Sequence, residues 1–224
     1  MARLEHIGKR FGQGAPVLAE VSLALEEGGF YVVTGGAGAG KTTLCGILAL
    51  ALAPSQGRLL LFDRDPARLG RDGRAALRRG LGIVFQELRL VDRLSARDNV
   101  ALPLRIAGAA PRRIDRDVGE LLLWLGLAER AERPAGALSA SERRLVAVAR
   151  AIVARPRLLI ADEPLADLDD AAVPGVMRVF EQVNRLGTTV LIATAGDGFA
   201  GNIAQLQYHL EDGRLASAGD VAAP

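Results

Sequence analysis

Short apolar runs alternate along the chain with stretches that have helical periodicity. Four runs are rich in Val, Ile and Leu, and they lie at residues 30–34, 81–85, 158–161 and 188–193. An unbroken apolar run of this length is typical of a strand covered on both faces, as in a parallel sheet. The pattern therefore predicts parallel strands that are linked by helices, which is an α/β fold.

Other segments have different patterns. Alternation between glycine-rich turns predicts an N-terminal antiparallel subdomain with strands at 4–7, 21–25 and 58–62. The strand pattern is missing from 92–134, where apolar residues recur on one helix face in 115–125, so we expect a helical insert. Near the C-terminus, Asp212 and Gly213 stand between two apolar positions and predict a hairpin.

Composition excludes several classes of protein. The chain has 224 residues, of which 50% are hydrophobic and 24% charged, which suits one globular domain. Acids are interspersed among the basic residues, so we predict no nucleic-acid partner. The single Cys45 fits a reducing compartment. The oiliest stretch stops at Pro54, far short of the ~20 residues of a membrane span, and we expect a cytoplasmic protein that reaches a membrane only through a partner.

Residues 35–43 read GGAGAGKTT and match the pattern G-x-x-x-x-G-K-[ST]. Small residues let backbone N–H groups surround phosphate oxygens at the N-terminus of the following helix, which is expected from Leu44 onward. Lys41 would reach the terminal phosphates, and the Thr42 hydroxyl would bind Mg²⁺. A glycine-rich turn without a ligand is the alternative, but the strand before and the helix after favour a phosphate site. Its predicted nucleotide contacts are Gly35, Gly36, Ala37, Gly38, Ala39, Gly40, Lys41, Thr42 and Thr43.

The stretch LLIADEPLADLDD, residues 158–170, carries an apolar strand into a group of five carboxylates. A buried strand that ends at Asp162 and Glu163 places both at the carboxyl edge of the sheet, where ligands bind. Asp162 would hold Mg²⁺, and Glu163 would orient or deprotonate an attacking water. An apolar run before two acids is weak evidence alone, but together with the phosphate loop it is strong.

These motifs together resemble the ATP-binding-cassette (ABC) ATPases over essentially the whole chain. The resemblance implies a P-loop NTPase core with an antiparallel β subdomain and a helical insert. It divides the single domain, 1–224, into a RecA-like core with the β subdomain (1–86 and 136–224) and a helical subdomain (87–135).

The resemblance also assigns roles to residues outside the loop. It implies that Gln86 senses the γ-phosphate and the metal, that Phe11 stacks on adenine, and that Asp169 lies in a segment crossing a dimer interface. Ser139 would contact the nucleotide of a second chain. Glu163, Gln86 and Lys41 would then be the catalytic residues, and Thr42, Gln86 and Asp162 the metal ligands.

Three stretches resemble one branch of this family more closely than the others: IVFQELRLVDRLSARDNVALPLRIAG, LLIADEPLADLDD and FEQVNRLGTTVLIAT. They resemble the bacterial cell-division branch, in which the ATPase FtsE works with the membrane subunit FtsX. Lipoprotein-release and macrolide-export ATPases share much of this pattern. The resemblance implies two chains that sandwich two ATP and Mg²⁺, as a homodimer or a heterodimer, docked on an FtsX-like membrane subunit. Leu88, Leu90, Val91 and Leu94 are candidate apolar contacts for that subunit, or else core residues.

Two motifs depart from the family pattern. LSASE at 138–142 replaces LSGGQ or LSGGE, and Leu145 stands where an arginine is usual. Ser139 and Glu142 still make a capping box for a helix that runs to about Val153. Ala195 replaces a histidine that contacts the γ-phosphate. We interpret His6 and His209 as structural.

These departures leave the activity open. We expect intact MgATP binding but hydrolysis that is weak or dependent on the partner, because losing one positioned donor typically costs about 10²–10³ in rate. A non-hydrolysing scaffold locked by ATP, and an ordinary transport ATPase, are the alternatives.

Overall fold

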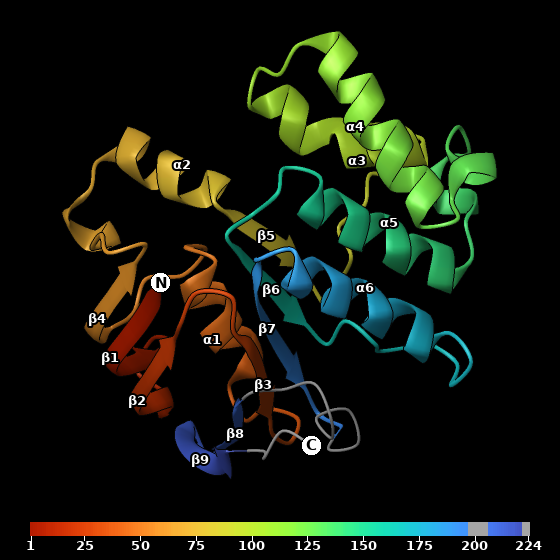
Figure 1. The fold of residues 1–224 in the computed structure, drawn as a ribbon. Helices are drawn as coiled ribbons and strands as arrows, with labels where there is room; N and C mark the ends of the chain where they lie inside the picture. Colours follow the sequence, from red (N-terminus) through yellow and green to blue (C-terminus); the bar gives the residue numbers. More distant parts are fainter. Residues whose placement is uncertain (197–205, 221–224) are drawn as a thin grey trace.

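The computed structural model describes residues 1–196 and 206–220, and the side chains of all of these except 217–220 (Figure 1). The strands are β1 (Ala2–Arg10), β2 (Pro16–Leu25), β3 (Phe30–Thr34), β4 (Gln56–Leu61), β5 (Leu81–Val84), β6 (Leu158–Asp162), β7 (Thr189–Thr194), β8 (Leu206–Glu211) and β9 (Arg214–Asp220). The α-helices are α1 (Lys41–Leu48), α2 (Arg71–Arg79), α3 (Ala96–Ile106), α4 (Pro111–Trp124), α5 (Ala140–Ile152) and α6 (Val173–Arg185).

A six-stranded sheet in the order β5-β6-β7-β3-β8-β9 carries the centre of the fold. The four strands that the apolar runs predict, β5, β6, β7 and β3, pair in parallel and are continuous neighbours. β8 pairs in parallel with β3, and only β9, at the edge, is antiparallel. The parallel strands therefore end at one common edge, because parallel neighbours point the same way.

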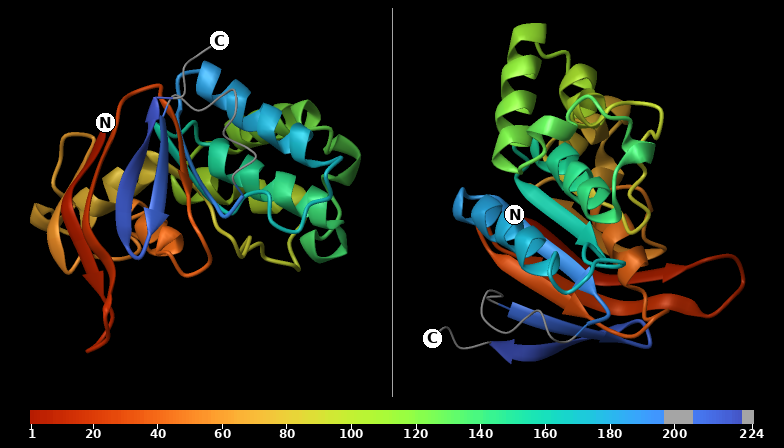
Figure 2. Two further views of the ribbon diagram at one scale, coloured as in Figure 1. Left: turned by 90° about the horizontal axis from the view of Figure 1, so that it is seen from below. Right: turned by 90° about the vertical axis from the view of Figure 1, so that its right-hand side faces the viewer.

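The two faces of this sheet are covered by different helices (Figures 1 and 2). Val33, Ile160 and Leu191 point to the face that packs on α1 and on the N-terminal strands. Their neighbours Val32, Leu159 and Val190 point to the opposite face, which packs on α5 and α6. This alternation with period two explains why the strands have continuous apolar sequences: both of their faces are core.

The N-terminal strands make a separate three-stranded sheet in the order β2-β1-β4, with both pairs antiparallel. This confirms the fold class, with its antiparallel subdomain. At the other end of the molecule, α3 and α4 pack on α5 around a third apolar cluster that includes Val100, Val118 and Val146 (Figure 1). The division of the chain at 86 and 136 stays a prediction.

Two predicted boundaries differ from the structure. α1 begins at Lys41 rather than at Leu44, so the last residues of the phosphate motif form the first turn of the helix. α4 begins at Pro111, four residues before the predicted start, because proline is compatible with a first helical turn. The hairpin is where we expect it: Asp212 and Gly213 have φ of 46° and 72°, as a type I′ turn between β8 and β9 requires.

Candidate functional site: a nucleotide cradle at one sheet edge

Four of the segments that the sequence singles out emerge from the carboxyl edge of the six-stranded sheet. Gln86 follows β5, Glu163 follows β6, Ala195 follows β7, and Gly35 follows β3. Because these strands are neighbours in this order, Ala195 emerges between Glu163 and the phosphate loop. The backbone N–H of Glu163 donates to the carbonyl of Ala193, which joins the ends of β6 and β7 at 2.8 Å. The Glu163 backbone is therefore held against the end of β7.

The loop before α1 has the properties of an anion cradle. A Cβ on Gly35 would collide with the carbonyl oxygen of Leu210, and one on Gly40 would lie 2.8 Å from a methyl carbon of Leu18. Gly40 also has a φ of 109°, a conformation that side chains disfavour. It is the N-cap of α1 but offers no side-chain cap, and the first turn has no acidic residue. The first N–H groups of α1 therefore remain available to an anion.

Lys41 and Glu163 meet at the centre of this edge. The Lys41 ammonium lies 3.3 Å from the Glu163 carboxylate, and both side chains are largely buried. It also donates to the carbonyls of Gly35 at 2.7 Å and Gly36 at 3.1 Å. The Lys41 ammonium thus lies over the loop, in the space where phosphate oxygens would bind. An incoming phosphate would compete with Glu163 for the same cation.

Asp162 fits the metal role assigned to it. Its carboxylate is buried, and its Oδ1 has no hydrogen-bond partner among the described residues. Burial raises the pKa of Asp162, the Glu163 charge raises it further, and a hydrogen bond from Thr42 and the Lys41 charge lower it. An orphaned, buried carboxylate oxygen beside a threonine hydroxyl is the donor set that Mg²⁺ takes together with substrate phosphates. Thr42 and Asp162 therefore fit this metal.

The remaining predicted residues lie farther from the cradle. Phe11 is 50% exposed in the β1–β2 turn, with the Lys9 ammonium 5.0 Å from its ring centroid. Gln86 is exposed and makes no hydrogen bond or ion pair within the described part of the chain. Asp169 is exposed, and its carboxylate accepts from the Ala172 N–H at 2.8 Å. None of these three makes a hydrogen bond, ion pair or ring contact with the loop at 35–43.

Ser139 is the N-cap of α5, which lies away from the phosphate loop (Figures 1 and 2). Its hydroxyl accepts from the Glu142 N–H at 3.2 Å and shares a hydrogen bond with the Ser141 hydroxyl at 3.2 Å. The Glu142 carboxylate in turn accepts from the Ser139 N–H, which completes the predicted capping box. The structure therefore accounts for Ser139 through helix capping, and its contact with a second chain's nucleotide stays a prediction.

Ala195 is exposed at the sheet edge and offers no donor to a phosphate. His209 is closer to the site than its position in the sequence suggests, because β8 pairs with β3 and sets His209 opposite Thr34. Its Nδ1 lies 3.1 Å from the Thr34 hydroxyl, directly before the loop. We keep the structural interpretation of His209, since this hydrogen bond fastens β8 to β3.

Two arginines of α5 were not predicted to bear on the site. Arg144 is buried and donates to the carbonyl of Ala166, in the turn after Glu163, at 2.6 Å. Arg150 donates to the carbonyls of Leu88 and Arg89, in the segment after Gln86. Burial lowers the pKa of both arginines. The available signal was periodicity: Arg144 occupies the helix stripe of Val148 and Ile152, where a charge is unexpected.

Comparison with known proteins places these features in one family. The profile that describes the ABC transporter family matches residues 18–166. The chain belongs to the ABC transporter family. The matched range contains the cradle, the capped N-terminus of α5 and the two acids that end β6.

Relatives of known role resemble the chain over almost its full length. It is 38% identical to the cell division ATP-binding protein FtsE of Escherichia coli (strain K12), over 96% of this chain and 97% of the relative. It is also 38% identical to the lipoprotein-releasing system ATP-binding protein LolD of Bordetella pertussis (strain Tohama I), over 94% of this chain and 93% of that one. The chain is thus an ABC ATPase subunit similar to both.

Among solved structures, the ATP-binding cassette MJ0796, a dimer in a post-hydrolysis state bound to ADP and Pi, superimposes with a TM-score of 0.91. It is 26% identical, and the match covers 100% of both chains. This likeness confirms the ABC ATPase fold.

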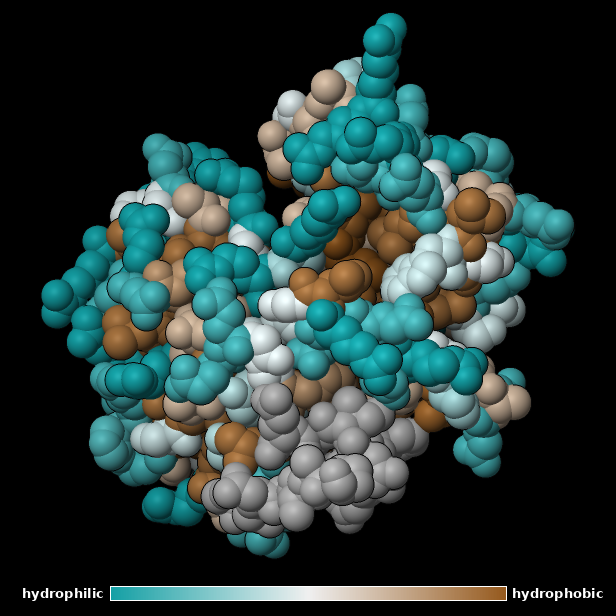
Figure 3. Space-filling model, viewed as in Figure 1, coloured by the Kyte–Doolittle hydropathy of each residue, from teal (hydrophilic) through white to brown (hydrophobic). Residues whose placement is uncertain are grey.

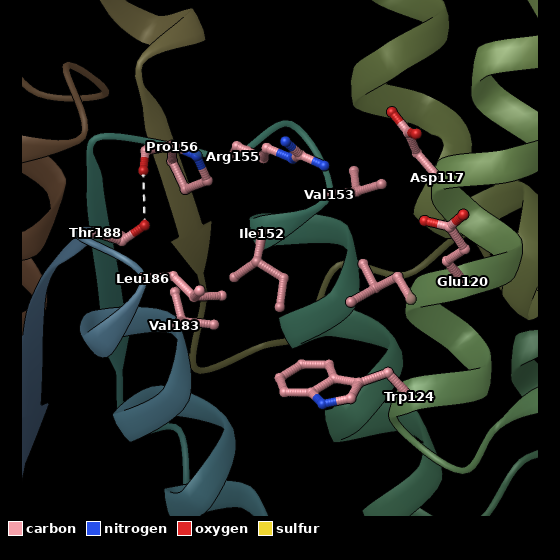
Figure 4. Close-up of a pocket in the computed structure, with 11 residues that line it drawn as sticks. Asp117, Glu120, Trp124, Ile152, Val153, Arg155, Pro156, Val183, Leu186 and Thr188 are labelled. Atoms are coloured by element: carbon pink, nitrogen blue, oxygen red, sulfur yellow. Dashed lines mark hydrogen bonds between the residues drawn. The ribbon is translucent and has the colours of Figure 1, made fainter.

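An apolar cavity of about 560 Å³ lies apart from the cradle, between α4, α5 and α6. Trp124 and Ile152 line it, with Asp117 and Glu120 at its α4 side (Figure 4), and apolar surface is visible among these helices in Figure 3. None of its lining residues belongs to the phosphate loop or to the edge that carries Glu163. It is therefore distinct from the nucleotide site.

Proposed function

We propose that this chain is the ATP-binding subunit of an FtsE–FtsX-like membrane complex in bacterial cell division. It would bind MgATP in a head-to-tail dimer and couple that binding to a membrane partner, with weak or partner-dependent hydrolysis. One observation carries the proposal: an uncapped helix N-terminus, Lys41 and an orphaned Asp162 oxygen meet at one edge, in a chain that matches FtsE over 96% of its length.

Each residue of the cradle has a defined task in this proposal. The N–H groups of α1 and the Lys41 ammonium bind the phosphates, and Thr42 and Asp162 would hold Mg²⁺. The metal, when bound, neutralises charge that develops on the transferred phosphoryl group. Phosphate would replace the Glu163 carboxylate at Lys41, which leaves that carboxylate to hold a water and accept its proton.

Lys41→Ala tests nucleotide binding directly. We expect the heat of association with ATPγS and Mg²⁺, measured by calorimetry, to disappear, because the Lys41 ammonium lies inside the cradle, against the carbonyls of Gly35 and Gly36. Arg97→Ala is the control for the loss of one cation, since Arg97 lies in α3 and its guanidinium donates to the Glu132 carboxylate instead. If the parent chain shows no such heat, the proposal is wrong.

An apolar groove of about 330 Å³ beside the Gln86 segment is the best candidate for the docking site of the membrane partner. Phe85, Pro103 and Ile106 line it, and Ile106 is 85% exposed. The expected contacts Leu88, Leu90, Val91 and Leu94 are only half exposed, and none of them lines this groove. No helix in the described ranges is long and apolar enough to cross a membrane.

Ile106→Glu separates docking from nucleotide binding. We expect it to abolish co-purification with the membrane protein encoded by the neighbouring reading frame and to leave the affinity for MgATP unchanged. Leu186→Glu is the matched control, because Leu186 is also 85% exposed but lines the other cavity, near Trp124, and not this groove. Equal loss of the partner from both variants would contradict the docking site.

The identity with LolD supports a second candidate, the ATPase subunit of a lipoprotein-releasing transporter. The partner decides between the two. A four-span membrane protein with a large outer domain that resembles FtsX supports the cell-division role, and a partner that resembles a lipoprotein-release subunit supports the other.

The lost donor at Ala195 favours a third candidate, a scaffold that ATP locks without hydrolysis. ATP turnover measured with and without the partner distinguishes it from the first two, because a scaffold stays inactive in both conditions.

A further inference from the structure

The guanidinium of Arg144 is a buried cation with incomplete hydrogen bonding. The residue is 4% exposed, and among the residues that the structure describes only Nη2 has a partner, the carbonyl of Ala166. Nε and Nη1, which carry three of the five N–H groups of an arginine, have no partner among the described residues. Buried donors normally have partners, so this arrangement lacks an acceptor.

The bonded acceptor lies in the turn that carries Glu163. This turn is bounded by two non-glycine residues in the left-handed region, Glu163 with a φ of 45° and Asp167 with a φ of 61°. Ala166 lies between them, and its N–H donates back to the carbonyl of Glu163 at 3.2 Å. Strained backbone of this kind persists where surrounding contacts hold it, and the bond from Arg144 is such a contact.

Asp167 is the complementary group. Its carboxylate is exposed and makes no hydrogen bond or ion pair in the described part of the chain, although it follows Ala166 directly. It is near enough for its charge to raise the pKa of Arg144, against the larger effect of burial. Within the described ranges, a buried cation with free donors thus lies near a carboxylate that makes no hydrogen bond or ion pair.

We propose that Arg144 is a positioning residue for Glu163, which holds the turn 163–167 through Ala166 and closes on the Asp167 carboxylate when MgATP binds. This inference rests on the proposed nucleotide binding. Since Arg144 lies in the first turns of α5, it links the helix that Ser139 caps to the residue expected to activate water. The chain has this arginine one position before the place where its family usually has one.

Hydrogen–deuterium exchange of residues 163–170 in the full-length chain, with and without AMP-PNP and Mg²⁺, tests the closure. We expect the nucleotide to slow exchange of this segment in the parent and in Arg144→Lys, which keeps the cation. We expect no slowing in Asp167→Asn, which changes only a surface side chain, or in Arg144→Gln.

Arg143→Gln is the matched control on the same helix turn, because Arg143 bonds to Asp92 and to the Ala135 carbonyl instead of the turn. It should behave like the parent. In turnover assays, Arg144→Gln should lower kcat about tenfold or more with KM within about twofold, as displacement of a catalytic group does. Arg144→Lys should recover part of the loss.

Nucleotide-dependent slowing that is the same in Asp167→Asn as in the parent overturns the closure. Slowing that Arg143→Gln loses to the same extent as Arg144→Gln overturns the specific role of Arg144. A parent that binds no nucleotide in a calorimeter fails at the proposed function instead, and this inference fails with it.

Discussion

The N-termini of α1 and α5 both face anions in the family pattern, but in this chain the two N-termini are capped differently. At α1, glycine precedes the helix and leaves its first N–H groups uncapped, with Lys41 beside them. At α5, Ser139 and Glu142 satisfy those groups with a complete capping box, and two further side chains, Ala140 and Ser141, replace glycines. An uncapped N-terminus binds anions, whereas a capped one chiefly stabilises its own helix. The difference indicates that the N-terminus of α1 can bind a nucleotide. The N-terminus of α5, in contrast, is poorly equipped to complete the nucleotide site of a second chain.

We expect the largest effect from restoring the groups that the family pattern has and this chain lacks, at the N-terminus of α5 and after β7. We expect the triple variant Ala195→His, Ala140→Gly, Ser141→Gly to raise ATP turnover by about 10²–10³-fold, because it returns a donor to the γ-phosphate and lets backbone approach it. Steady-state phosphate release measures this. A triple variant no faster than the parent would show that the missing groups do not limit the rate.

Glu163→Gln tests the intact site, the nucleotide cradle at the N-terminus of α1. In a working ATPase we expect turnover to fall about 10²-fold or more, with MgATP retained on the protein after gel filtration, because the amide cannot accept a proton. Glu181→Gln, in α6, controls for the loss of one carboxylate outside the site. If Glu163→Gln changes neither turnover nor retention, Glu163 has no catalytic role and the scaffold interpretation is preferred.

Asp162→Asn should separate binding from stability. Burial raises the pKa of Asp162 above its ordinary value of 3.8, so the ionised carboxylate destabilises the ligand-free fold. For an acid with a raised pKa, stability declines as pH rises from the unfolded to the folded pKa. At pH 7 the variant should therefore unfold about 2–4 °C higher than the parent in the absence of nucleotide.

The same Asp162→Asn variant should lose the stabilisation that Mg²⁺ adds to ATP binding. Well below pH 3.8, Asp162 is protonated in both the folded and the unfolded parent, so the higher melting temperature of the variant should disappear. Calorimetric melting at several pH values checks both expectations, and an advantage that grew as pH fell would contradict the assignment.

The smallest effect concerns the cap of α5. Ser139→Ala should lower the melting temperature by about 2–4 °C, since an N-cap is worth about 1 kcal/mol, and should leave MgATP affinity of the single chain unchanged. Ser139→Thr, which keeps a capping hydroxyl, should restore most of the loss. A weaker MgATP affinity in Ser139→Ala would mean that Ser139 serves the nucleotide of its own chain.

The parallel core was predictable because its signal is local. The strands β3, β6 and β7 are buried on both faces, and β5 is buried on one face and half-buried on the other, so each sequence is an unbroken apolar run with turn residues at its ends. The phosphate loop was equally readable, since close backbone contacts exclude side chains at Gly35 and Gly40. The α2 and α6 helices carry no such motif, and their place on the sheet could not be inferred from their periodicity alone.

Local sequence thus sufficed for the strands, the phosphate motif and the capping box of α5, because each depends on residues within a few positions of one another. Tertiary structure alone decided that Ala195 emerges between Glu163 and the loop, that His209 meets Thr34, and that Arg144 reaches the carbonyl of Ala166. These contacts join segments far apart in the chain. They follow from the order of strands in the sheet and from the packing of α5 on its face. The periodicity of α5 marks Arg144 as an unexpected charge, but it does not identify the partner of that charge.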